Sequence, residues 1–105
     1  MPDLYLVERG KGPSWDHSRP RRQQNGWDEH AAFMDGLAEE GFVVMGGPVG
    51  DGDGDNALLI VDAADEATVR ARLADDPWGL DMLTFVSIRP WSVWLRAPSR
   101  RGDPV

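Results

Sequence analysis

The chain has 105 residues, of which 41% are hydrophobic, so it is long enough for one domain with one core and too short for two. Its formal net charge of −7 argues against binding to nucleic acid or to anionic lipid, and the lack of cysteine excludes disulfides and thiolate chemistry. No apolar run approaches the roughly 18 to 20 residues of a membrane span, and the N-terminal segment lacks the pattern of a secretory signal. We therefore expect a cytoplasmic protein without membrane association.

The first part of the chain predicts a strand, a long connection and a helix. Over residues 3–9, Leu4, Leu6 and Glu8 alternate with Tyr5 and Val7, which is typical of a strand buried on at least one face, and a Gly-Lys-Gly-Pro segment then ends it. The polar connection over residues 10–25 contains Trp15, which indicates that part of it packs against the domain. Residues 27–40 show helical spacing with Gly41 in the usual stop position, so we expect an amphipathic helix there.

The remainder of the chain predicts four short strands and a second helix. We expect strands over residues 42–45 (ended by Gly46-Gly47-Pro48), 57–61, 83–88 and, as an extra C-terminal strand, 91–95, with a helix that begins at Asp62 or Asp65 and ends before Pro77. A single domain would then cover residues 1–96, followed by a frayed tail over residues 97–105.

The predicted order of elements is β-α-β-β-α-β, which is the ferredoxin-like pattern of an α+β fold. In this pattern, an antiparallel sheet carries both helices on one face. Several of the predicted strands are apolar on both sides, and an open apolar face of that size is unusual in a monomer. We therefore expect a homodimer that packs sheet against sheet.

His30 is the better placed of the two histidines for chemistry. It falls in the first turn of the predicted helix, where the helix dipole disfavours an added positive charge and leaves the imidazole neutral and able to act as a base. The alternative is a histidine at the edge of the core that is hydrogen-bonded to backbone. Asp76 precedes a proline, where aspartate often only forms a turn. Both alternatives stay open on the residues alone.

Short motifs in a fixed order make the chain resemble the YCII-related family over roughly residues 3–95. They are His30, Phe33, Leu37 and Gly41 in the first helix, Gly47-Pro48 after the second strand, Asp76-Pro77 followed by Trp78, and Ile88-Arg89-Pro90-Trp91 near the end. The resemblance implies a ferredoxin-like fold of the dimeric α/β-barrel type. It also implies an active-site pair formed by a histidine and an aspartate, here His30 and Asp76. Some relatives are associated with lyase-type or dehydrochlorinase activity.

The resemblance leads us to expect a small enzyme without a cofactor. His30 would act as general acid/base and Asp76 would orient its ring, in an elimination or isomerisation of a small organic substrate. The expected substrate contacts are Trp27, Phe33, Pro48 and Trp78, and also Arg22 if the arginine-rich connection folds over the site. The alternative is a non-catalytic dimeric module that binds a small ligand or supports a larger assembly.

Two metal hypotheses have weaker support. The run Asp51-x-Asp53-x-Asp55 has the acidic spacing of a calcium loop, but Asn56 stands where the sharp turn needs glycine, so we favour a solvated acidic turn. A metal held by His17, His30 and a carboxylate stays open, although the two histidines lack the close spacing typical of zinc ligands. We predict no metal site.

Overall fold

A computed structural model describes residues 4–50 and 56–98 of the chain, and its fold is α+β. The elements are β1 (Leu4–Lys11), the 3₁₀ helix η1 (Arg21–Gln23), α1 (Trp27–Glu39), β2 (Val43–Pro48), β3 (Ala57–Val61), α2 (Glu66–Ala74), α3 (Gly79–Met82) and β4 (Leu83–Trp91). The strands lie in the order β2-β3-β1-β4, and each neighbouring pair is antiparallel. The predicted β-α-β-β-α-β pattern is confirmed. The short helix α3 is an addition that sequence analysis did not predict.

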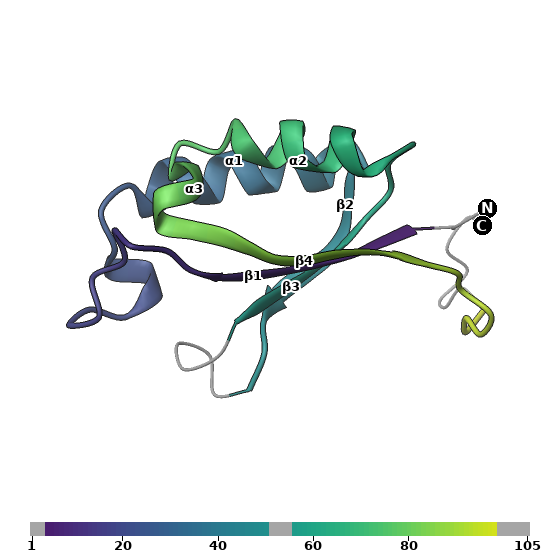
Figure 1. Cartoon of the computed structure of the whole chain (residues 1–105), viewed down its shortest axis with the longest axis horizontal. Helices are drawn as coiled ribbons and strands as arrows, with labels where there is room; N and C mark the ends of the chain where they lie inside the picture. Colours follow the sequence, from purple (N-terminus) through teal and green to yellow (C-terminus); the bar gives the residue numbers. More distant parts are fainter. Residues whose placement is uncertain (1–3, 51–55, 99–105) are drawn as a thin grey trace.

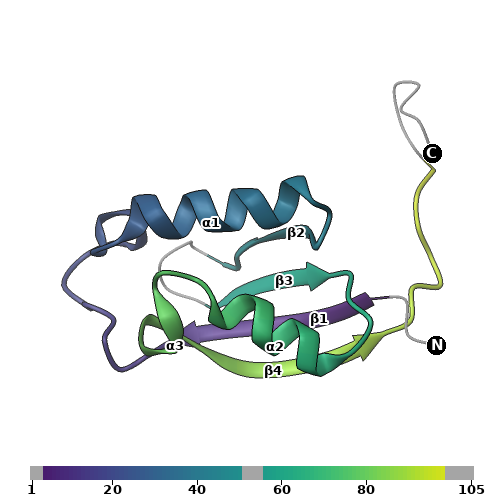
Figure 2. The ribbon, with the colours of Figure 1, turned by 90° about the horizontal axis from the view of Figure 1, so that it is seen from above.

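The molecule has two layers. The helices α1 and α2 lie above the same face of the sheet (Figure 1), and Figure 2 shows them side by side over the strands. Helix α3 and the connection between β1 and α1 lie together at one end of the sheet (Figure 1). In the part of the chain that the structure describes, no helix covers the opposite face, and none has the length and apolar character needed to cross a bilayer.

The main core lies between the sheet and the two long helices. Residues at alternate positions of β1 and β3 face the helices, as the two-residue period of a strand requires. The buried core residues are Tyr5, Val7, Leu37, Phe42, Val43, Leu59, Val61, Val69 and Leu73. Helix α2 contributes only Val69 and Leu73 to it, and both are fully buried.

The helix boundaries follow from local capping chemistry. The side chain of Asp65 accepts a hydrogen bond from the backbone N–H of Thr68 (2.8 Å), so Asp65 rather than Asp62 begins α2. Hydrogen bonding by the side chain and the backbone of Thr68 holds the pKa of Asp65 below its usual range. At the end of α1, Gly41 has a φ of +82°, a left-handed conformation that glycine adopts without strain.

The predicted ends of β2 and β4 and the predicted fifth strand are wrong, as is the predicted end of β1. Strand β2 continues through Gly46-Gly47-Pro48, and β4 continues through Pro90 to Trp91. Both strands lie at sheet edges, where a proline without an N–H is tolerated because one side of the strand needs no partner. No separate fifth strand follows β4 in residues 92–98, since the alternating residues near Trp91 partly belong to β4 itself.

The connection between β1 and α1 is packed against the domain. Strand β1 itself runs to Lys11, two residues beyond the predicted end. Trp15 is buried and joins Trp78 and Leu83 in a second apolar cluster. The buried side chain of Gln24 donates hydrogen bonds to the carbonyl oxygens of Asp16 (2.7 Å) and Arg19 (2.9 Å), which holds the turn between them. The acidic run over residues 51–55 and most of the predicted tail lie outside the described residues.

Candidate active site

His30 and Asp76 lie in direct contact, although 46 positions separate them in the sequence. His30 is in the first turn of α1, and Asp76 follows the end of α2, so the packing of the two helices over one sheet brings them together. The Nδ1 atom of His30 lies 2.6 Å from Oδ2 of Asp76. Both side chains are buried: that of Asp76 is 1% exposed and that of His30 is 11% exposed.

The hydrogen bonds of Asp76 define the tautomer of the neutral imidazole. A carboxylate only accepts hydrogen bonds, so Nδ1 of His30 carries the proton that it donates to Asp76. The other carboxylate oxygen, Oδ1, accepts from the backbone N–H of Trp78 (2.9 Å), which fixes the carboxylate in place. Nε2 of His30 is then the unprotonated nitrogen of the neutral ring. No hydrogen bond to it occurs within residues 4–50 and 56–98.

Two tryptophans, which also contact each other, pack against the imidazole. The ring of Trp78 stacks on His30 with centroids 3.9 Å apart and planes 8° apart, and Trp27 lies tilted 5.6 Å away. The indole of Trp78 is itself anchored, since its Nε1 donates to the carbonyl of Asn25 at 2.7 Å. Gly26 lets α1 begin against this ring: its φ is +79°, and a Cβ there would lie 3.2 Å from the indole. The histidine therefore has little freedom to rotate.

A cavity of about 240 Å³ opens beside His30. This volume is slightly below the range typical of ligand pockets, so the cavity suits a small organic molecule. One wall comes from α1 and consists of Trp27, His30, Ala31, Met34 and Asp35. The other walls consist of Arg21 of η1, of Gly46, Gly47 and Pro48 of β2, and of Arg9, Ala57, Leu59 and Leu83 of the other strands. The lining is mostly apolar, and its charged or titratable side chains among the described residues are Arg9, Arg21, His30 and Asp35.

Arg9 is the least expected member of this cavity. It is only 2% exposed, and its Nε and Nη2 donate to the carbonyl oxygens of Thr84 (3.2 Å) and Leu83 (2.9 Å) in β4. Its guanidinium also lies over the ring of Phe85, 4.4 Å from the centroid. Burial lowers the pKa of Arg9, while the negative charge of Asp76 raises it. A charged guanidinium thus lies in the interior, close enough to Asp76 to be attracted by it.

Not all the predicted substrate contacts reach the cavity. Trp27 and Pro48 line it, and Trp78 supports the imidazole from behind. Phe33 instead packs against the main core, because it lies on a different stripe of α1 from His30, Ala31 and Met34. Arg22 is exposed, and its neighbour Arg21 lines the cavity, since successive residues of a 3₁₀ helix point in different directions.

Sequence analysis missed Arg9, although the pattern of β1 contains a signal for it. Tyr5 and Val7 face the core, and Arg9 is the next residue on the same face of the strand. A charged residue at an inward position is the kind of exception that indicates a site. Treating residues 3–9 only as an alternating strand hid that exception.

The described residues contain no group of three or more histidine, aspartate or glutamate side chains placed to hold a metal ion. The exposed His17 lies in the connection and is not part of the cavity lining. The three-ligand hypothesis with His17 and His30 therefore has no geometric support in this part of the chain.

Comparison with known proteins identifies one relationship. The model of the family described as YCII-related domain matches residues 8–92, a span that includes both His30 and Asp76. Neither the curated proteins nor the solved structures contain a significant match to the chain.

Proposed function

The chain belongs to the YCII-related domain family, and on that basis we propose that it is a small enzyme in which the His30–Asp76 pair performs acid/base catalysis. The observation that carries the proposal is the 2.6 Å contact between Nδ1 of His30 and Asp76 beside a cavity. A histidine with one nitrogen held by a carboxylate and the other unprotonated is arranged as a general base. The expected reaction class is a lyase or an isomerase.

The proposed chemistry needs only one base. Nε2 of His30 removes a proton from a carbon atom of the substrate, and the ring becomes an imidazolium. The electron pair left on carbon either expels a leaving group from the neighbouring carbon or moves a double bond, after which the imidazolium returns the proton at another position. Asp76 stabilises the developing charge electrostatically, and the stacked face of Trp78 adds a cation–π attraction.

Deuterium exchange into a panel of model compounds tests this proposal. Small cyclic ketones, lactones and hydroxy acids are incubated with the protein in D₂O, and loss of C–H signals is followed by NMR. We expect exchange in at least one compound, and we expect His30→Asn to lower its rate by about 10² to 10⁴-fold. His17→Asn is the matched control, since His17 is exposed and is not among the residues that line the cavity. Equal exchange rates in wild type and His30→Asn would contradict the proposed base.

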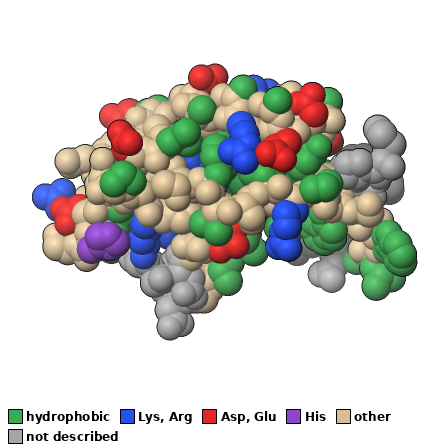
Figure 3. Space-filling view, viewed as in Figure 1, with side chains coloured by type: hydrophobic (Ala, Val, Ile, Leu, Met, Phe, Trp, Pro, Cys, Tyr) green, Lys and Arg blue, Asp and Glu red, His purple; other side chains and the backbone are tan. Residues whose placement is uncertain are grey.

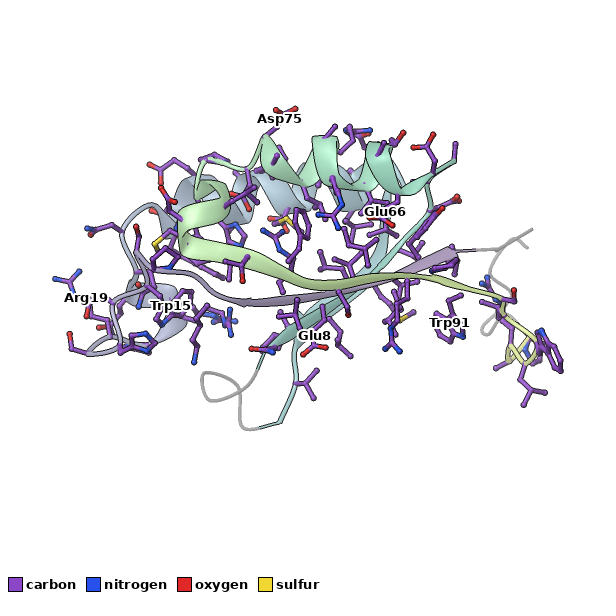
Figure 4. The ribbon with its side chains drawn as sticks, viewed as in Figure 1. Glu8, Trp15, Arg19, Glu66, Asp75 and Trp91 are labelled. Carbon is purple, nitrogen blue, oxygen red and sulfur yellow. The ribbon has the colours of Figure 1, made fainter. Side chains whose placement is uncertain are left out.

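We also propose that the uncovered sheet face forms a homodimer. Figure 4 shows Glu8 and Trp91 on the side of the sheet opposite the helices. A shallow, mostly apolar surface there is lined by Leu4, Val44, Met45, Ile60, Trp91, Val93, Leu95 and Arg96. In Figure 3, hydrophobic side chains gather below the strands at the right-hand end. Met45 is 65% exposed and Trp91 is 43% exposed, which favours a partner on this face.

Introducing a charge on this face tests the dimer. Met45→Lys would bury an ammonium group in the proposed interface, so we expect at least a roughly tenfold weaker association, measured by sedimentation equilibrium. Ala38→Lys adds the same charge to an exposed position of α1 and should leave association unchanged. A wild-type protein that sediments as a monomer at micromolar concentrations would overturn the proposed interface.

A further inference from the structure

The buried guanidinium of Arg9 lacks an ion-pair partner in the part of the chain that the structure describes. The ion pairs seen there include Arg19 with Asp16, His30 with Asp76, Arg70 with Glu66 and Arg72 with Glu40, and none involves Arg9. The nearby carboxylate, Asp76, has its two oxygens occupied by His30 and by the backbone N–H of Trp78. A buried charge without direct pairing is costly, and proteins retain such a charge chiefly where it serves a site.

The geometry of Arg9 leaves one edge of its guanidinium open. A guanidinium has five N–H donors. The Nε and Nη2 atoms bond to two carbonyl oxygens of β4, which occupy the side edge of the group. Within residues 4–50 and 56–98, Nη1 forms no hydrogen bond. The edge formed by Nη1 and the second N–H of Nη2 is thus available, and Arg9 lines the cavity that also contains His30.

The charges around this cavity favour an anion in spite of the acidic protein. Two guanidiniums, those of Arg9 and Arg21, line it together with His30. Among the described residues, the lining contains one acidic side chain, that of Asp35, which is exposed. In the described part of the chain, the lining thus holds two guanidiniums and one carboxylate, although the formal charge of the protein is −7. An apolar cavity with one buried guanidinium matches a small apolar molecule that carries one anionic group.

We propose that the substrate of this site is a small carboxylic acid, whose carboxylate pairs with Arg9 while its reacting carbon faces Nε2 of His30. This inference rests on the proposed acid/base function and specifies its substrate class. The planar carboxylate accepts two parallel N–H bonds from the open edge of the guanidinium, a geometry that arginine provides and lysine does not. Two fixed bonds at one end of a molecule this small determine which C–H bond lies against the imidazole.

Binding of benzoate and of benzamide tests the inference without any turnover. The two probes have nearly the same shape, but only benzoate is charged. We expect benzoate to bind the wild-type protein at least about tenfold more tightly than benzamide, as measured by NMR titration of the tryptophan indole N–H signals. The preference for benzoate should fall about tenfold or more in Arg9→Gln. It should fall as much in Arg9→Lys, a second variant that keeps the positive charge but lacks the planar edge with two N–H donors.

Arg89→Gln is the matched control. Arg89 is exposed on β4 and pairs in register with Leu6 on the uncovered face, so its loss should leave the preference for benzoate unchanged. Equal affinities of the two probes for the wild-type protein would overturn the inference, and this comparison does not depend on the folding of any variant. Loss of the preference in Arg89→Gln would overturn it as well. If deuterium exchange depends on His30 but the protein binds benzoate no better than benzamide, the carboxylic-acid inference fails and the acid/base proposal is retained.

Discussion

Asp76→Asn is expected to leave the protein folded and to lower the rate of His30-dependent deuterium exchange by about 10⁴-fold. An asparagine has nearly the same shape as aspartate, and its Oδ1 can still accept the hydrogen bond from the backbone N–H of Trp78. Its Nδ2, however, is a donor where the carboxylate was an acceptor. The contact with His30 at 2.6 Å then requires Nδ1 to accept, so the imidazole proton moves to Nε2.

This change of tautomer removes the catalytic base but leaves the rest of the site in place. With the proton on Nε2, the nitrogen that faces the substrate has no lone pair to accept a proton from carbon. The imidazole ¹⁵N shifts report the tautomer directly: the wild-type His30 should show a protonated Nδ1, and the variant a protonated Nε2. His17, which is exposed, provides an internal reference in the same spectrum. An unchanged tautomer together with an unchanged exchange rate would show that Asp76 does not orient the ring.

Leu73→Ala is expected to lower the free energy of unfolding by about 2 to 5 kcal/mol. Leu73 is fully buried, and with Val69 it is all that α2 contributes to the core. Truncation leaves a cavity between this short helix and the sheet, and a helix of nine residues has little stability of its own to compensate. Chemical denaturation followed by far-UV circular dichroism measures the loss.

Leu80→Ala is the matched control for this stability prediction. Leu80 lies in α3 and is 45% exposed, so the same truncation should cost well under half as much. A loss in Leu73→Ala no larger than in Leu80→Ala would mean that α2 is not held by the packing described above. Because Asp76 lies two residues after the end of this helix, we also expect Leu73→Ala to weaken the hydrogen bond between Asp76 and His30.

The order of elements was predictable because it depends on local patterns. Residues 57–61 form a continuous apolar run of the length of a strand, and Gly41 stands where a helix needs a left-handed residue. The strand ends were not predictable in the same way. Gly46-Gly47-Pro48 is a typical turn segment, but it remains in β2 because Gly46 approaches β3 closely: a Cβ there would lie 3.0 Å from the carbonyl oxygen of Leu58.

The candidate site also has features that were predictable from the sequence and features that were not. The sequence by itself determined the family pattern and the chemical identity of the pair, because His30 and Asp76 lie in short motifs of fixed order. Only the tertiary structure decided which side chains surround that pair. Helix packing excluded Phe33 from the cavity, and the pairing of β1 with β4 brought Arg9 into it and supplied two carbonyl oxygens for its guanidinium. A side chain's environment depends on contacts between residues far apart in the chain, and local periodicity carries no information about those contacts.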